Sequence, residues 1–220
     1  MSQEPTVAAT DDADRAARFP RRTSRRLETR ARIVEAASKL FRGVGYADAT
    51  MAAIAEAADV HVTTLFTHFK TKAELVATLG DAAIDELAGF IESSRGKTPF
   101  FAFFRAVVVG AAKAFQHDAG PNIAMGHELR RDPQLAFGWM DYERRQIEML
   151  AAYIAADYGL DLAADMRPML VASLLMNSTT LAHDRWLESK RALDLVEETL
   201  KALDIAQAMA ESVLGTPTNV

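Results

Sequence analysis

The chain has 220 residues, of which 50% are hydrophobic, a net charge of −5 and no cysteine. This length and composition allow a sizeable buried core, and the lack of cysteine excludes disulfides, thiolate metal sites and a cysteine nucleophile. No apolar run approaches the roughly 20 residues that cross a bilayer, and the polar, acidic start is unlike a signal peptide. We therefore expect a globular, cytoplasmic protein without a membrane partner.

The charge is distributed unevenly along the chain. Residues 15–75 hold twelve Lys or Arg against six Asp or Glu, whereas residues 76–220 hold thirteen against twenty. A basic segment attached to an acidic body predicts one surface that meets a polyanion. An ordinary solvated face explains the charge alone equally well.

Residues 1–22 are predicted to form a disordered arm, because large apolar residues are few there and prolines interrupt them. Apolar residues then recur at helical spacing over residues 33–44, and Gly43 and Gly45 end that helix. The arginines that precede this pattern are Arg18, Arg21, Arg22, Arg25 and Arg26. Such an arm can follow DNA phosphates or enter a narrow minor groove, although a solubilising tail has the same composition.

Two short helices joined by a tight turn are predicted next. Thr50 is a good N-cap for the first, whose apolar stripe contains Ile54 and Ala58. The second begins near residue 61 and ends around residue 69, with Leu65 and Phe69 four residues apart on its inner side. Two small helices that cross through one turn form a helix-turn-helix, whose second member is narrow enough to enter the DNA major groove.

The outer positions of the second helix are Val62, Thr63 and Thr67, which alternate with the buried ones and are candidates to reach base edges. Directly afterwards, Thr71-Lys72-Ala73-Glu74 matches the S/T-x-x-E capping box and starts another helix. A cation in a first turn is unfavourable with respect to the helix dipole. Lys72 is easier to understand at this position if it faces a DNA phosphate.

Fragments of one pattern occur in order over some 45 residues: R-x-x-I-V-E-A-A-x-x-L-F-x-x-x-G at residues 30–45, then Thr50, Ile54-Ala55, Ala58-x-Val60, Thr64-Leu65-Phe66-x-His68-Phe69 and Lys72-x-x-Leu75. In this order and spacing they resemble the DNA-binding domain of the TetR family of transcriptional regulators. The resemblance implies a homodimer that represses transcription at a palindromic, double-stranded DNA operator. It also implies release from the operator when a small hydrophobic or amphipathic effector occupies the C-terminal domain.

The resemblance implies roles for single residues as well. It places Thr50, Thr64 and Lys72 at backbone contacts, His68 at a backbone or base contact, and Val62 and Thr63 at bases. The predicted DNA-binding residues are Arg25, Arg26, Thr50, His61, Val62, Thr63, Thr64, Phe66, Thr67, His68 and Lys72. Phe66 departs from the family's usual tyrosine and lacks the hydroxyl that donates to a phosphate. His61 replaces a hydroxyl-bearing cap, and Asp59 and Thr63 occupy positions that are often glycine.

Helical patterns continue over residues 71–93, 98–117, 122–130, 132–158, 163–189 and 192–214. Thr98 and Pro99 provide an N-cap and a first-turn proline for a phenylalanine-rich helix, which is apolar on more than one face and expected to be central and buried. We expect an all-α fold of about nine helices. It divides into the arm (1–22), a three-helix helix-turn-helix DNA-binding domain (23–72), a helical ligand-binding and dimerisation domain (73–214) and a frayed tail (215–220).

The last two predicted helices carry more apolar residues than one small domain needs. One is lined by Leu170, Leu174 and Leu181, and the other by Leu193, Val196, Leu200 and Leu203. Packing against the same pair from a second copy gives a four-helix dimer interface, as the resemblance implies. Without the resemblance, an ordinary monomeric core is the simpler explanation.

The resemblance further implies a ligand pocket among the helices of residues 98–189. Its predicted residues combine apolar groups with one amide, as suits an organic ligand: Phe104, Val108, Met125, Leu129, Trp139, Met140 and Asn177. Ordinary core packing explains the same residues equally well. Asn177 is the most informative, because an amide within an apolar run needs a hydrogen-bond partner.

Catalytic and metal motifs fail on inspection. The stretch from His127 has arginine where the H-E-x-x-H zinc motif needs its second histidine, and no nucleophile elbow, P-loop or dinucleotide fingerprint occurs. His117, His127 and His183 remain candidates for one polar or metal site, although scattered histidines are more often surface or core residues. We predict a DNA-binding regulator that is not an enzyme and needs no metal or cofactor. The alternative is a small-molecule-binding protein with weak, non-specific DNA affinity.

Overall fold

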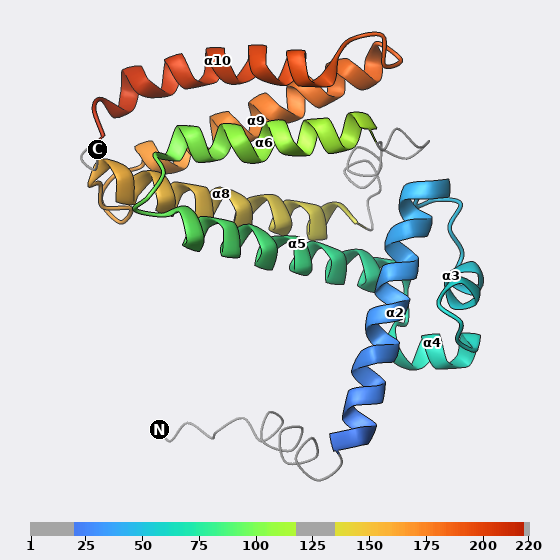
Figure 1. Ribbon diagram of the computed structural model, residues 1–220. Coiled ribbons are helices and arrows are strands. Elements are labelled where there is room, and N and C mark those ends of the chain that lie inside the picture. The colour runs from blue at the N-terminus through green and yellow to red at the C-terminus, as the bar shows by residue number, and fades with distance from the viewer. Residues whose placement is uncertain (1–19, 118–134, 218–220) are drawn as a thin grey trace, which may run out of the picture.

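The computed structural model describes residues 20–117 and 135–217. These residues form eight helices and no strand, arranged as a small N-terminal unit beside a longer helical bundle (Figure 1). The all-α fold class is therefore confirmed. The short helix predicted at residues 122–130 lies outside the described residues.

The N-terminal unit consists of α2 (Pro20–Val44), α3 (Met51–Ala57) and α4 (Val62–His68). Proline suits the first turn of α2, because the amides at a helix N-terminus have no intrahelical partner. The expectation that Arg25 and Arg26 precede the helix is wrong, since both lie inside it. Arginine, leucine and glutamate are good helix formers, and the Ser24 hydroxyl donates to Glu28 one turn on.

A compact apolar cluster holds this unit together. Its largest fully buried members come from all three helices and the start of the next: Ile33, Phe41, Ile54, Leu65, Phe69 and Leu75. The predicted inward positions of both short helices are thus confirmed. Each of these side chains contributes about 1.5–3 kcal/mol by being buried rather than exposed, and their packing fixes the crossing of α3 and α4.

The bundle consists of α5 (Lys72–Ser94), α6 (Phe100–His117), α8 (Ala136–Tyr158), α9 (Arg167–Glu188) and α10 (Leu195–Leu214). Figure 1 shows α9 and α10 side by side on one side of the bundle, with α5 and α8 on the other and α6 between them. A second apolar cluster fills the bundle, around Phe100, Phe103, Tyr153, Ile154, Leu175 and Leu203. Leu203, expected on a dimer face, is only 2% exposed and packs inside its own protomer.

Helix α5 belongs to both units. Leu75 near its start is buried in the N-terminal cluster, whereas Ile91 near its end is buried in the bundle cluster. Arg30 of α2 donates to the Thr78 hydroxyl (3.2 Å), and Arg145 of α8 pairs with Asp81 one turn later (2.6 Å). The predicted division between residues 72 and 73 falls at the start of this shared helix.

Helix α6 differs from expectation in its start and its burial. It begins at Phe100, and the carboxylate of Asp157 on α8 accepts the Phe100 amide at 2.6 Å. Burial raises the pKa of this Asp157 carboxyl. The helix is buried on one face only, because its outer positions are small or polar apart from Phe115, which is exposed. The helix lies between the other members of the bundle, as predicted, but the predicted burial holds for one face only.

The last two helices also start later than predicted. Pro168 is tolerated in a first turn but not further inside a helix, so α9 begins at Arg167, where the Asp165 carboxylate accepts the backbone amide (2.9 Å). Helix α10 begins after Asp194, whose carboxylate caps the Glu197 amide (2.9 Å). Both starts follow from local capping that periodicity alone does not locate.

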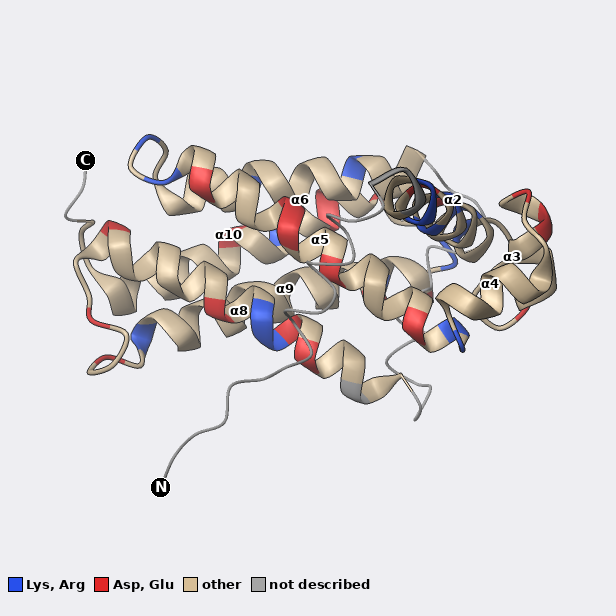
Figure 2. Ribbon diagram, turned by 90° about the horizontal axis from the view of Figure 1, so that it is seen from below, with Lys and Arg blue, Asp and Glu red and all other residues tan. Residues whose placement is uncertain are grey.

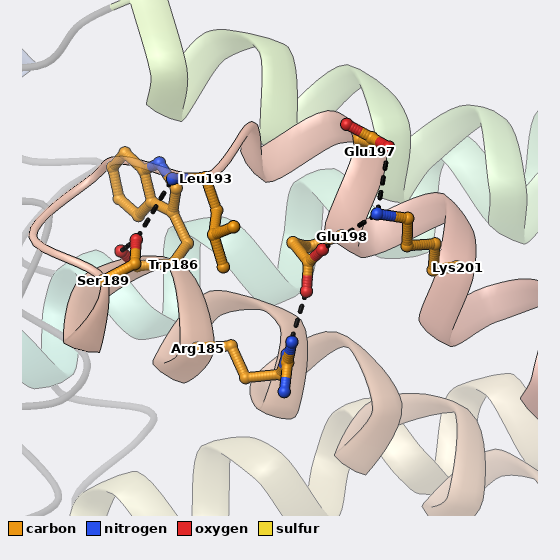
Figure 3. A network of polar contacts seen from close by, with 7 residues as sticks. All are labelled: Arg185, Trp186, Ser189, Leu193, Glu197, Glu198 and Lys201. Atoms are coloured by element: carbon orange, nitrogen blue, oxygen red, sulfur yellow. Dashed lines mark hydrogen bonds and ion pairs between the residues drawn. The ribbon is translucent and has the colours of Figure 1, made fainter.

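The connection between α9 and α10 is tightly tied (Figure 3). Trp186 is almost fully buried there, and Ser189 accepts the amide of Leu193 (3.2 Å). Arg185 and Lys201 both donate to the carboxylate of Glu198, at 2.8 and 3.2 Å. The Arg185–Glu198 pair joins α9 to α10, and the Ser189 bond holds the connection between them, so together they fix the outer surface that the two helices present.

Candidate nucleic-acid interface

The helix-turn-helix geometry is built by caps and one unusual turn residue. The Thr50 hydroxyl accepts the Ala53 amide at 3.1 Å, so Thr50 is the N-cap of α3 as predicted. Asp59, between α3 and α4, has φ of +51°. This left-handed conformation favours glycine, but aspartate tolerates it better than most residues. The turn therefore keeps its path without a glycine.

Helix α4 is capped by an imidazole in place of a hydroxyl. Nδ1 of His61 accepts the Thr63 amide (3.4 Å) and lies 2.8 Å from the Thr63 hydroxyl. At the other end of the helix, Lys70 donates from Nζ to the Phe66 carbonyl at 2.7 Å. The residue that departs from the usual cap thus still performs the capping.

One side of α4 is open to solvent. Thr63, Phe66 and Thr67 are exposed and follow the i, i+3, i+4 spacing of a single helix face. Val62, expected on this face, is half-buried and packs against the N-terminal cluster. The prediction that Val62 is exposed is therefore wrong, because it shares the inner stripe with Leu65 at i+3. Thr64 is also half-buried.

Basic side chains lie beside this face. Arg25 and Arg26 are exposed on α2, and basic residues mark much of this helix in Figure 2. Burial, and then the charges of Arg26 and Arg30, hold the pKa of His68 below its ordinary value. The Arg30 guanidinium also covers the Phe69 ring, 4.2 Å from its centroid. The arginines of α2 and the end of α4 therefore form one electropositive region.

Lys72 has contacts that the sequence did not indicate. Its ammonium donates to the carbonyls of Tyr46 (2.6 Å) and Ala47 (3.2 Å) and lies 4.4 Å from the centroid of the Tyr46 ring. The Thr71 hydroxyl caps the Glu74 amide as predicted, while Glu74 accepts the Lys70 amide. An ammonium has three N–H donors, so the α2–α3 turn occupies two of them.

The described candidates for the ligand site differ in their burial and surroundings. Phe104 is buried and stacks with Phe100, and half-buried Val108 packs against the same cluster. Trp139 lies beside Tyr142, 5.5 Å between ring centroids. Met140 is 63% exposed. Met125 and Leu129 lie outside the described residues.

The argument for Asn177 as a ligand residue assumed that its amide is buried, and this assumption is wrong. Its side chain is exposed on α9 and donates to the Ser173 carbonyl of its own helix (2.9 Å). It is therefore not a buried amide in need of a partner. The apolar run around it suggested burial because α9 is apolar on an outward face as well as an inward one.

The described part of the chain offers neither a metal-binding cluster nor a membrane-spanning helix. It contains no group of three or more histidine or acidic side chains placed to hold a metal ion, and His127 lies outside it. Among the helices of residues 20–117 and 135–217, none combines the length and apolarity that a membrane crossing requires.

Comparison with known proteins identifies the family. A model of bacterial regulatory proteins of the tetR family matches residues 33–79. The sequence is also 35% identical to the HTH-type transcriptional regulator TcmR of Streptomyces glaucescens over 168 residues, 72% of this chain and 73% of the relative. The chain belongs to the TetR family. It is therefore a DNA-binding transcriptional regulator, and the resemblance seen in residues 30–75 is confirmed.

One further sequence relative is a transcriptional activator, and one solved repressor structure shares the fold. The HTH-type transcriptional activator FasR of Mycolicibacterium smegmatis is 28% identical over 169 residues, 76% of each chain. The FadR repressor of Thermus thermophilus, solved with lauroyl-CoA, superposes with a TM-score of 0.59 at 24% identity. That match covers 81% of this chain and 93% of FadR, and it shows the shared fold.

Proposed function

We propose that this TetR-family protein is a homodimeric repressor that leaves a palindromic operator when a small apolar or amphipathic ligand binds the bundle. The observation that carries the proposal is the solvent-exposed face of α4 beside the arginines of α2. A helix of this exposure fits the major groove, and exposed arginines suit the adjacent phosphates. No catalytic constellation competes with this surface among the described residues.

The proposed DNA contact of each residue is assigned from its position in the helix-turn-helix. Arg25, Arg26, Thr50 and Thr64 hold the DNA backbone, and Lys72 reaches it with the donor that the turn leaves. His61 positions Thr63 through the cap described above. Thr63, Phe66 and Thr67 face the bases because they are the exposed side chains of α4. His68 lies at the edge of the groove, near the arginines of α2.

The proposed dimer uses the outer faces of α9 and α10. Large apolar side chains are exposed there within the protomer: Leu170 and Leu181 on α9, and Ile205, Met209 and Val213 on α10. Exposed apolar groups repeated along two neighbouring helices mark a protein interface. In such a two-fold pair the two recognition helices have to lie about 34–36 Å apart to enter successive major grooves.

The proposed ligand site lies among α6, α8 and α9. Phe104, Val108 and Trp139 are its remaining described candidates, and they offer apolar and aromatic surface with few polar groups. The lauroyl-CoA in the FadR structure supports an acyl or similarly amphipathic ligand for this chain. A fluorescence titration with acyl-CoA of increasing chain length tests this directly, because Trp139 is one of only two tryptophans.

Gel shifts with the gene's own upstream DNA at several salt concentrations test the function. We expect one sequence-specific complex whose affinity falls steeply with salt, because phosphate contacts release counterions. A reporter gene behind the same DNA then distinguishes repression from the activation described for FasR. A protein that binds ligand tightly but binds all DNA equally weakly contradicts the proposal.

DNA affinity is expected to rise as the pH falls from about 8 towards 6. In the DNA-free protein His68 favours its neutral form, because burial and the charges of Arg26 and Arg30 lower its pKa. A nearby phosphate favours the imidazolium, so binding takes up a proton, and affinity gains up to about tenfold for each unit by which DNA raises this pKa. His68→Gln is expected to flatten the pH profile, whereas His117→Gln, far away on α6, leaves it unchanged. An equal slope in wild type and His68→Gln contradicts the contact.

A further inference from the structure

The recognition helix lacks the side chains that most often read bases. Val62–His68 contains no arginine, lysine, asparagine or glutamine. Guanine is commonly recognised by bidentate arginine or lysine, and adenine by bidentate asparagine or glutamine. Direct readout by α4 must therefore depend on another property of the base edges.

The hydroxyls of the two exposed threonines already make hydrogen bonds within the protein. The Thr67 hydroxyl donates to the Thr63 carbonyl at 2.9 Å. The Thr63 hydroxyl lies 2.8 Å from His61 Nδ1 and shares one hydrogen bond with the ring, whose direction depends on the imidazole tautomer. Both hydroxyls are therefore held by contacts within the protein, and the Thr67 proton is already used and is not offered to the acceptors of guanine.

The exposed face of α4 consists mainly of apolar groups. Thr63, Phe66 and Thr67 lie on one side of α4, and Phe66 is 41% exposed although it is a large apolar residue. Phe66 also lacks a hydroxyl that would direct it to a phosphate. Thr64 and His68, the remaining polar residues of the helix, are both half-buried, and His68 lies near Arg26 and Arg30. Two methyl groups and one aromatic ring therefore dominate the surface that enters the groove.

We propose that α4 recognises thymine through its C5-methyl group, with Thr63, Phe66 and Thr67 as the specificity-determining residues. Thymine is the base that presents a methyl group in the major groove, and threonine methyls and phenylalanine are its apolar partners. The inference rests on the proposed operator binding and names the base chemistry that it uses. The preferred half-site carries thymines opposite this face, on either strand.

The experiment begins with the full-length protein and a duplex selected from a random pool by binding. Each thymine of a half-site is then replaced by deoxyuridine, which removes only the methyl group. We expect about a fourfold loss of affinity for each contacted methyl, and little change at thymines outside the footprint of α4. Replacing a non-contacted cytosine by 5-methylcytosine serves as a control for added methyl groups.

Matched variants assign the contacts. Thr67→Ser and Thr63→Ser each remove one methyl and keep the hydroxyl with its bond, while Phe66→Ala removes the ring. Each variant is expected to abolish the deoxyuridine effect at one thymine and leave it at the others. Thr98→Ser removes a methyl just before α6 in the bundle, outside the helix-turn-helix, and is expected to leave every deoxyuridine effect in place.

The outcomes separate the two levels of the proposal. Failure to select any preferred duplex overturns the proposed function itself. A preferred duplex that binds equally well with uracil throughout overturns the thymine proposal and leaves operator binding intact. A third outcome also overturns the thymine proposal: uracil DNA binds more weakly, but by the same factor in wild type, Phe66→Ala, Thr63→Ser and Thr67→Ser. The methyl groups would then be contacted by other residues.

Discussion

Replacing Leu181 and Ile205 together by glutamate is expected to produce a folded monomer that binds operator DNA at least about 100-fold more weakly. These side chains are 58% and 66% exposed in the protomer, so the charges do not disturb its core. In a dimer the carboxylates would be buried opposite apolar side chains, which is strongly unfavourable. The DNA loss follows because each half-site then binds without the effective concentration that a linked second half-site provides.

Analytical ultracentrifugation, circular dichroism and gel shifts on the same samples check this result. Phe90→Glu is the matched control, because Phe90 is a similarly exposed large apolar residue on α5, away from α9 and α10. We expect that variant to remain dimeric and to bind DNA normally. If the double variant stays dimeric with wild-type DNA affinity, the interface lies elsewhere on the protein.

Lys72→Met is expected to lower both the stability of the helix-turn-helix and its DNA affinity. The ammonium bonds two carbonyls of the α2–α3 turn, and bonds to charged groups typically contribute about 1.5–3 kcal/mol each before exposure is considered. Since Lys72 is half-buried, we expect a loss of about 2 kcal/mol in total. The turn leads directly to Thr50, so its loosening also displaces the proposed backbone contacts.

Chemical denaturation and gel shifts over a salt series separate positioning from charge. Lys70→Met removes the same charge two residues earlier from an exposed side chain that bonds only the end of α4. We expect Lys70→Met to retain nearly full stability, whereas Lys72→Met unfolds at lower denaturant. Equal stability of the two variants would show that the carbonyl bonds of Lys72 do not hold the turn. The salt slope then reports how much phosphate contact each lysine makes.

Local signals predicted the helix-turn-helix well. Thr50 and Thr71 cap their helices as their sequence context indicates, and Ile54, Leu65 and Phe69 are buried as their spacing requires. Such features depend on residues within a few positions of one another, so both partners of each interaction can be identified from a short stretch of sequence. The family resemblance covers the same segment. The match to TcmR, which extends over 72% of this chain, confirms that the protein is a transcriptional regulator.

Features that depend on distant residues were missed. The carboxylate of Asp157 meets the start of α6 across 57 positions, and Lys72 reaches the Tyr46 carbonyl across 26. Asn177 was expected to be buried because its neighbours are apolar, but those neighbours divide between an inner and an outer face of α9. Periodicity reveals that a face is apolar without revealing whether the same chain covers it.

The shared helix α5 has a thermodynamic consequence. Its first turns complete the cluster around Leu75, and its later turns complete the cluster around Ile91, with no break between Lys72 and Ser94. If either cluster unfolds, one end of α5 loses its packing, and the same continuous helix supports the other cluster at its other end. The two clusters are therefore expected to unfold in one cooperative transition. A molecule that binds only the bundle would then slow hydrogen exchange in α3 and α4, which it never touches.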